Sequence, residues 1–153
     1  MGVLQLDLLS LNRPVNKLII HCSATSSNMD IGAHEIRKWH VDPKPKGNGW
    51  LDIGYHWVIK RDGTIEDGRD VNRVGAHTKG YNTGSLGICM VGGVNEDGNP
   101  SDNFTKEQWH SMELMARGIK AMIPHITIHG HNEYANKACP SFSVQTWVQS
   151  KNI

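Results

Sequence analysis

Two short apolar segments constrain the fold of this chain more than any other feature. Lys17–His21 and Leu86–Val91 are largely apolar and contain isoleucine, which is typical of strands buried in a sheet. His125–His129 alternates isoleucine with polar residues and indicates a third strand. Because buried strands need other elements packed on them, these segments favour a layered fold.

A hairpin and a helix are expected between these strands. Tyr55–Lys60 is rich in aromatic and β-branched residues, Asp62-Gly63 is a turn sequence, and Ile65 lies on the expected return strand. Asp30 can cap a helix that runs to about His40. The residues expected near one face of that helix are Ala33, Ile36, Trp39 and His40.

The helix that begins at Thr105 has the clearest sequence signals. Thr105 and Gln108 form a capping box, and Phe104 and Trp109 are placed as its hydrophobic staple. Pro124 ends the helix. Apolar side chains recur at helical spacing at Trp109, Met112, Met115, Ala116, Ile119 and Met122.

Together these elements predict a single α/β domain with a central mixed β-sheet flanked by helices. The domain is expected to span residues 17–153 and to end in a short helix over Ser143–Lys151. Met1–Asn16 is expected to form an N-terminal arm. Its leucines can pack on the edge of the domain: Leu4, Leu6, Leu8, Leu9 and Leu11.

Length and charge narrow the classes of function. A chain of 153 residues fits one domain with a core of its own. Its formal charge of +1 gives no general electrostatic reason to bind nucleic acid or an anionic membrane. Three cysteines argue against a complete disulfide framework and for synthesis in a reducing compartment. Met1–Asn16 contains Asp7 and has no basic residue before its apolar run, so we do not expect it to act as a secretory signal. No apolar run in the sequence is long enough to span a bilayer.

The tail of the chain brings metal-ligand residue types close together. His129, His131 and Cys139 lie within eleven residues, and Lys137 lies between the last two. Imidazole nitrogen and thiolate sulfur suit zinc. A further ligand must come from elsewhere, and His21 at the end of the first strand is the candidate.

The residue types and their spacing leave alternatives to this metal site open. The spacing of His131 and Cys139 is not that of a zinc finger, so a buried cysteine with surface histidines is an alternative interpretation. His129 competes with His131, because residues two apart on a strand share a face. Cys22 cannot face the same side of a strand as His21, so it is expected in the core.

Six segments, in order along the chain, resemble the zinc amidases of short-tailed phages. These phage lysozymes share a fold with animal peptidoglycan-recognition proteins. The segments are His21–Thr25, Glu35–His40, Trp50–His56, Ile59–Thr64, Gly75–Asn82 and Lys137–Phe142.

The resemblance implies N-acetylmuramoyl-L-alanine amidase activity, in which the amide between muramic acid and the first L-alanine of the peptidoglycan stem is cut. It places the ligands of one Zn²⁺ on His21, His131 and Cys139. It places the catalytic tyrosine on Tyr55 and the catalytic lysine on Lys137. It implies a phage endolysin that lyses its host.

The resemblance also implies a substrate contact for His77. Two segments depart from the resembled lysozymes: Val41–Gly49 is longer, and Asn136 replaces a common proline. Cys89, inside an apolar strand, is expected in the core. The remaining histidines are expected to be structural or on the surface: His34, His40, His56, His110, His125 and His129.

Two other functions are weighed against the amidase. One is a noncatalytic peptidoglycan-binding module on the same fold. The other is inhibition of a phage RNA polymerase, which some lysozymes of the resembled group carry out partly through the N-terminal arm; Met1–Asn16 does not clearly match that arm. We expect a monomer that has no membrane contact and is made in the host bacterial cytoplasm. A separate membrane-permeabilising protein would give it access to the cell wall.

Overall fold

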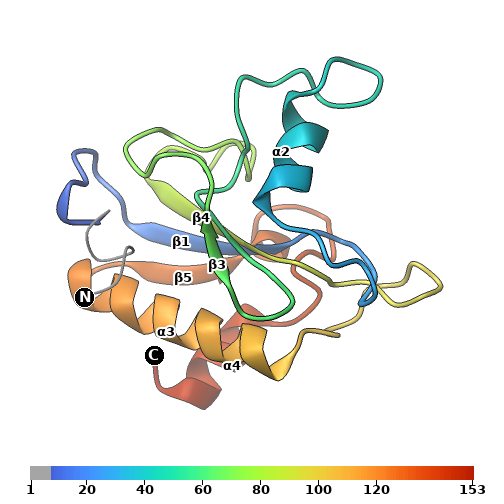
Figure 1. Ribbon diagram of the computed structural model, residues 1–153. Coiled ribbons are helices and arrows are strands. Elements are labelled where there is room, and N and C mark those ends of the chain that lie inside the picture. Colours follow the sequence, from blue (N-terminus) through green and yellow to red (C-terminus); the bar gives the residue numbers. More distant parts are fainter. Residues whose placement is uncertain (1–7) are drawn as a thin grey trace.

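Within residues 8–153, which this computed structural model describes, five strands form one mixed sheet in the order β3-β2-β4-β1-β5 (Figure 1). The strands are β1 (Lys17–Cys22), β2 (Trp57–Ile59), β3 (Ile65–Asp67), β4 (Ser85–Met90) and β5 (Thr127–Gly130). Four of them run parallel, and β3 pairs antiparallel with β2 as the return strand of the hairpin. The predicted α/β fold with a central mixed sheet is confirmed.

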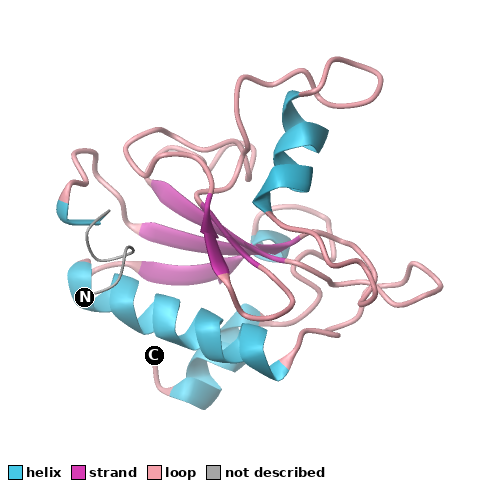
Figure 2. Cartoon of the chain, viewed as in Figure 1, coloured by secondary structure: helices cyan, strands magenta, loops and turns pink. Residues whose placement is uncertain are grey.

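The helices lie on both sides of this sheet (Figure 2). They are α2 (Ala33–Val41), α3 (Lys106–Met122), α4 (Val144–Lys151) and the short 3₁₀ helix η1 (His131–Glu133). The large core lies between the sheet and α3 and α4, where Ile20 and Ile88 meet Met112. A smaller core lies on the other face, where Ile36 of α2 packs with Val58.

The register of β1 positions the functional site. Ile20 lies opposite Ile88 of β4 on one side and opposite Gly130 of β5 on the other. Since these strands are parallel, their carboxyl ends meet at one edge of the sheet. His21 therefore lies beside the point where the chain leaves β5 and enters η1 at His131.

Helix α3 begins as its sequence predicts. The Thr105 hydroxyl accepts a hydrogen bond from the Gln108 backbone N–H at 3.0 Å, and the Gln108 side chain accepts one from the Thr105 N–H at 3.0 Å. The rings of Phe104 and Trp109 lie 5.6 Å apart as the staple. The local signals were sufficient here because all of these contacts lie within five residues of one another.

Helix α2 differs from its prediction at its amino end. Its N-cap is Gly32, not Asp30. The first free N–H groups donate instead to carboxylates: Gly32 N–H to Glu35 at 2.7 Å and Ala33 N–H to Glu66 at 2.8 Å. Glu66 belongs to β3, so this cap depends on a contact that helix sequence alone does not reveal. Trp39, expected near the buried face, is 40% exposed.

Strands β1 and β4 match their expected bounds to within one residue, whereas β2 and β5 depart further. The strand predicted over Tyr55–Lys60 is limited to Trp57–Ile59, and the strand predicted over His125–His129 extends over Thr127–Gly130. His131 is therefore not on the strand. It lies in η1, so the expectation that His129 and His131 share a strand face is wrong.

The predicted arm Met1–Asn16 is described only from residue 8, so the expected packing of Leu4 and Leu6 lies outside the described residues. Leu8 and Val15 are buried in the large core, and Leu11 packs against it. Leu9 is 62% exposed, contrary to the expectation for it. The boundary between arm and domain at residue 17 stays a prediction. In the described part of the chain, no helix combines the length and the apolar character that a membrane span requires.

Candidate metal centre

Three candidate ligands meet at the edge of the sheet where β1 and β5 end. Single donor atoms of His21, His131 and Cys139 all lie within 4.8 Å of one another. Among the residues that the structure describes, this is the one such group of three His, Cys, Asp or Glu side chains. Two nitrogens and one sulfur fit Zn²⁺, whose usual protein ligands are imidazole and thiolate.

Cys139 reaches the site because the tail of the chain is tied to the end of β1. Its Sγ atom accepts a hydrogen bond from the Cys22 backbone N–H at 3.3 Å. The Ser141 hydroxyl donates to the Gly93 carbonyl at 2.7 Å, which fixes the tail against the loop after β4. The neighbouring Cys22 thiol and burial raise the pKa of the Cys139 thiol.

The His21 ring presents different nitrogens to different neighbours. Nδ1 lies 3.8 Å from Sγ of Cys139, whereas Nε2 lies 2.9 Å from Nδ1 of His77. Burial, followed by the nearby His77, His131 and Lys137, lowers the pKa of His21 well below its usual value. Burial and Lys137 also lower the pKa of His131. Both imidazoles are therefore neutral near pH 7, which is the form that binds a metal.

Tyr55 lies directly against the site. Its ring is 5.1 Å from the ring of His21. The preceding residue, Gly54, is held from both sides: its N–H donates to His40 Nδ1 at 2.9 Å, and its carbonyl accepts from the Ala76 N–H at 3.1 Å. Burial, together with the nearby thiols of Cys89, Cys139 and Cys22, raises the pKa of Tyr55 well above its usual value.

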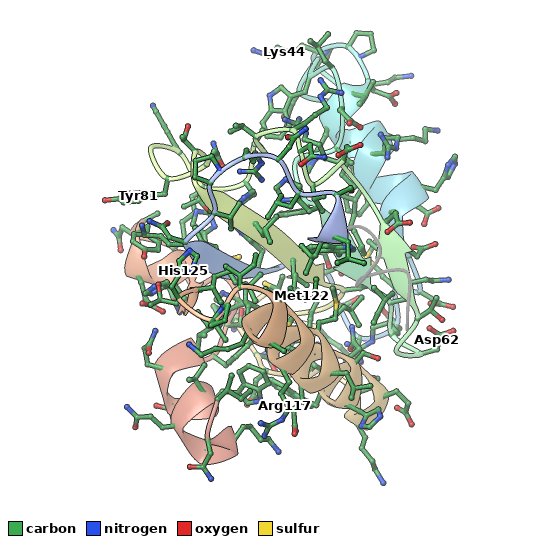
Figure 3. The ribbon with its side chains drawn as sticks, turned by 90° about the vertical axis from the view of Figure 1, so that its left-hand side faces the viewer. Lys44, Asp62, Tyr81, Arg117, Met122 and His125 are labelled. Carbon is green, nitrogen blue, oxygen red and sulfur yellow. The ribbon has the colours of Figure 1, made fainter. Side chains whose placement is uncertain are left out.

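A cleft of about 660 Å³ opens beside the candidate ligands. His131 and the exposed Lys137 line one part of it, and Trp50 lines another. Tyr134 also lines the cleft, and its ring lies 4.2 Å from that of Tyr81. Figure 3 shows Tyr81 at the outer edge of the molecule. The cleft therefore lies next to the metal-ligand cluster and shares His131 with it.

A second cavity of about 670 Å³ lies at the opposite ends of the strands. It is lined by Arg13, Val15, Met122 and His125 among others. None of the three clustered ligands lines it, so its size alone does not make it the functional site.

His77 lies between the cleft and the metal-ligand cluster. It is 8% exposed and lines the cleft, and its Nδ1 atom faces Nε2 of His21. Burial, followed by the nearby His56 and His131 and then by two arginines, lowers its pKa to about 3. Thr78, which follows it, is 1% exposed and lies 3.2 Å from Nε2 of His21. Thr78 had no predicted role of its own, although its position beside His77 was a signal.

The competing residues have other partners. His129 makes a 2.9 Å contact with Glu133 and a 2.7 Å contact with the Thr127 hydroxyl. Cys22 packs into the large core, and Cys89 is fully buried in the smaller one, as expected for both. The other histidines outside the cluster take structural or surface positions: His34, His40, His56, His110 and His125.

The comparisons with known proteins cover almost the whole chain. The N-acetylmuramoyl-L-alanine amidase family matches residues 11–142. The endolysin of Enterobacteria phage K11 is 47% identical over 138 residues, which are 90% of this chain and 88% of that protein. An endolysin N-acetylmuramoyl-L-alanine amidase from Clostridium intestinale superposes with a TM-score of 0.76 at 26% identity, covering 92% of this chain and 86% of its own. Bumblebee PGRP-SA superposes with a TM-score of 0.72 at 28% identity, and the match covers 91% of this chain and 83% of PGRP-SA. The residues matched by the family include every candidate ligand.

Proposed function

This chain belongs to the N-acetylmuramoyl-L-alanine amidase family and is an enzyme of that class, and we propose that it depends on one zinc ion held by His21, His131 and Cys139. Its substrate is bacterial peptidoglycan, in which it cuts the amide between N-acetylmuramic acid and L-alanine. The observation that carries the zinc assignment is the convergence of three donor atoms within 4.8 Å beside the cleft.

Bound zinc would supply Lewis acidity, which activates water at neutral pH and polarises an amide carbonyl. His21 and His131 offer neutral nitrogens to the ion, and Cys139 offers sulfur. Each comes from a different segment, so the folded chain, rather than any local motif, creates the site. Three protein ligands leave room for a reactant, as in other catalytic zinc sites.

Lys137 is proposed to stabilise negative charge on the substrate carbonyl oxygen as the amide is attacked. It lines the cleft two residues before Cys139 and is exposed, so its ammonium group can reach a bound substrate. A donor aimed at a developing oxyanion contributes most in a site that excludes water.

Tyr55 is proposed to handle protons at the same centre. Its ring lies against His21, and its hydroxyl can both accept and donate a hydrogen bond. From this position it can orient the attacking water and pass a proton to the leaving nitrogen. Because Tyr55, Lys137 and Cys139 are all present, catalysis is favoured over a noncatalytic peptidoglycan-binding module.

The experiment is digestion of purified peptidoglycan followed by mass spectrometry. The expected products are glycans with free lactyl carboxylates and stem peptides with free amino-terminal L-alanine. Chelation should stop their release and added zinc should restore it. Full activity in protein shown by metal analysis to be metal-free would overturn the zinc assignment, and new glycan reducing ends in place of free peptides would overturn the bond assignment.

Action in the cell is proposed to need access through the inner membrane. Relatives at 43–47% identity are phage endolysins, and the sequence predicts synthesis in the host cytoplasm. Isolated sacculi should therefore be digested, whereas intact cells should resist added protein unless their membranes are permeabilised. Inhibition of a phage RNA polymerase stays an alternative that the sequence does not support, and residues 1–7 of the implicated arm lie outside the described residues.

A further inference from the structure

The partners of His21 are unusual for a metal-binding histidine. Such a histidine normally donates its second ring N–H to a carboxylate, a backbone carbonyl or water, which fixes the ring and its tautomer. In the part of the chain that the structure describes, Nε2 of His21 instead faces the imidazole of His77 at 2.9 Å and the Thr78 hydroxyl at 3.2 Å.

The direction of the hydrogen bonds can be deduced from the far side of His77. The Ser85 hydroxyl donates its one proton to the Asn82 carbonyl at 3.0 Å. At its 3.3 Å contact with Nε2 of His77, the Ser85 oxygen can therefore only accept, so Nε2 of His77 carries the proton. Nδ1 of the neutral His77 ring is then an acceptor, and it faces Nε2 of His21.

We propose that His77 is a positioning residue that holds His21 in the tautomer with its proton on Nε2, leaving the Nδ1 lone pair for the metal. The order of donation runs from His21 to His77 and on to Ser85. This inference rests on the proposed zinc site and adds to it the group that orients one ligand. It gives His77 a role other than the substrate contact implied by the resemblance.

Two glycines make room for the His77 ring. A Cβ atom at Gly87 of β4 would lie 2.7 Å from ring atoms of His77, and one at Gly75 would lie 2.6 Å from its Cδ2 atom. Contacts this short are not tolerated, so the ring fits only because both side chains are absent. The backbone of His77 is fixed as well, since its N–H donates to the Asn82 side-chain oxygen at 2.9 Å.

Thr78 is the competing acceptor. Its hydroxyl lies 2.9 Å from Nδ1 of His77 and 3.2 Å from Nε2 of His21. The shorter distance from His21 is to His77, and the Thr78 hydroxyl can donate its own proton to the same acceptor. Replacing Thr78 with valine keeps the shape and removes the hydroxyl, so this variant is a matched control.

The experiment is zinc affinity of the full chain, measured by competition with a chromophoric chelator. His77→Ala should weaken zinc binding by about 10–100-fold, as is typical when the partner of a ligand is lost. His77→Asn should stay within a few-fold of wild type, because its amide oxygen can accept from His21 at the position of Nδ1. Thr78→Val should also stay near wild type. In imidazole NMR of the zinc-loaded protein, the His21 Nε2 proton should be protected from exchange, and this protection should be lost in His77→Ala.

The other outcomes each have a defined meaning. Unchanged zinc affinity in His77→Ala, or a larger loss in Thr78→Val, would overturn the positioning role. Equal losses in His77→Ala and His77→Asn would assign His77 to packing alone and likewise overturn it. A raised KM for peptidoglycan with unchanged zinc affinity would return His77 to substrate contact. Failure of the wild type to bind zinc would overturn the proposed function itself.

A second variant tests the seating of the ring without changing its chemistry. Gly87→Ala should displace His77 and weaken zinc binding in the same direction as His77→Ala. Wild-type affinity in a folded Gly87→Ala protein would contradict the steric argument. If this variant does not fold, the comparison of His77→Ala with His77→Asn still decides the proposal.

Discussion

The two faces of the sheet are built from different chemistry. Beneath α3 and α4, the strands present a large apolar cluster, which includes Leu18, Ile20 and Ile88. The opposite face carries His21 and, under its neighbouring loops, His56 and His77, all at most 8% exposed. Buried imidazoles cost free energy unless their nitrogens are hydrogen-bonded, and each of these three has such partners. One face therefore supplies most of the apolar burial, and the other holds a polar network at the metal-ligand cluster.

This difference predicts that changes on the two faces have separable effects. The largest effect on activity is expected for Cys139→Ser, which removes the proposed sulfur ligand. Activity should fall by more than the roughly 10–100-fold typical of losing a ligand's partner. The thermal unfolding of the metal-free variant should stay close to that of the metal-free wild type, because Cys139 is only half-buried. Cys22→Ala is the control: it should destabilise the fold and retain zinc.

Lys137→Gln should remove charge from the cleft and leave the ligands intact. The rate of stem-peptide release is expected to fall by about 100–1000-fold, as for other lost oxyanion donors. Zinc affinity should change little. A variant that lost zinc and activity in parallel would show that Lys137 acts on the metal site rather than on the substrate.

Ile119→Ala tests the apolar face. Ile119 lies on the buried face of α3 and is fully buried, so the substitution should lower the free energy of unfolding by about 2–5 kcal/mol. Denaturant titration measures this loss, and zinc affinity below the unfolding transition should not change. Leu114→Ala on the same helix is the control, since Leu114 is 56% exposed and should cost less than about 0.5 kcal/mol.

His56 tests the polar face through pH. Burial, against partial opposition from the Arg73 carbonyl, lowers its pKa to about 4. Between this value and the usual value of 6.5, the unfolded chain binds a proton here and the native chain does not. Stability from this group is therefore complete above about pH 6.5 and is lost as pH falls towards 4, by on the order of 3 kcal/mol.

The measurement for His56 is the free energy of unfolding against pH for wild type and His56→Asn at one zinc concentration. The asparagine can accept the Gly87 N–H bond that Nδ1 of His56 accepts at 3.0 Å. The slope in this window should fall by up to about 1.4 kcal/mol per pH unit in the variant. Identical slopes would contradict a neutral, buried His56.

The smallest effect is expected at the start of α3. Thr105→Ala removes the capping oxygen that accepts from the Gln108 N–H and should cost about 1 kcal/mol of stability. Denaturant titration measures it. Thr105 lies on the face of the sheet that α3 covers, away from the metal-ligand cluster, so activity per folded molecule should not change. A loss of activity would argue against the separation of the two faces.

Sequence predicted best where the contacts are local. The capping box of Thr105 and Gln108 and the apolar run of β1 depend on neighbouring residues, and both are confirmed. The prediction of Asp30 as the N-cap of α2 was wrong because Glu66, 33 positions from Ala33, supplies the acceptor for the Ala33 N–H. The end of β5 was wrong because the alternation of isoleucine with polar residues does not reveal where a 3₁₀ turn begins.

The site divides in the same way. The motifs placed His21, His131 and Cys139 in order, and the structure brings these three side chains together. They did not reveal that His77 lies behind His21, because this contact spans 56 residues and depends on a glycine in β4. They also gave no indication of the Tyr81–Tyr134 pair, whose rings come from two separate loops.

The most direct test of the account is zinc X-ray absorption spectroscopy of the purified protein with metal analysis. The account predicts one zinc per chain, with a single sulfur at about 2.3 Å and nitrogens at about 2.0–2.1 Å. The sulfur signal should persist in Cys22→Ala and disappear in Cys139→Ser. A zinc ion with two sulfur ligands, or one whose spectrum is unchanged in Cys139→Ser, would contradict the assignment of His21, His131 and Cys139 as its ligands.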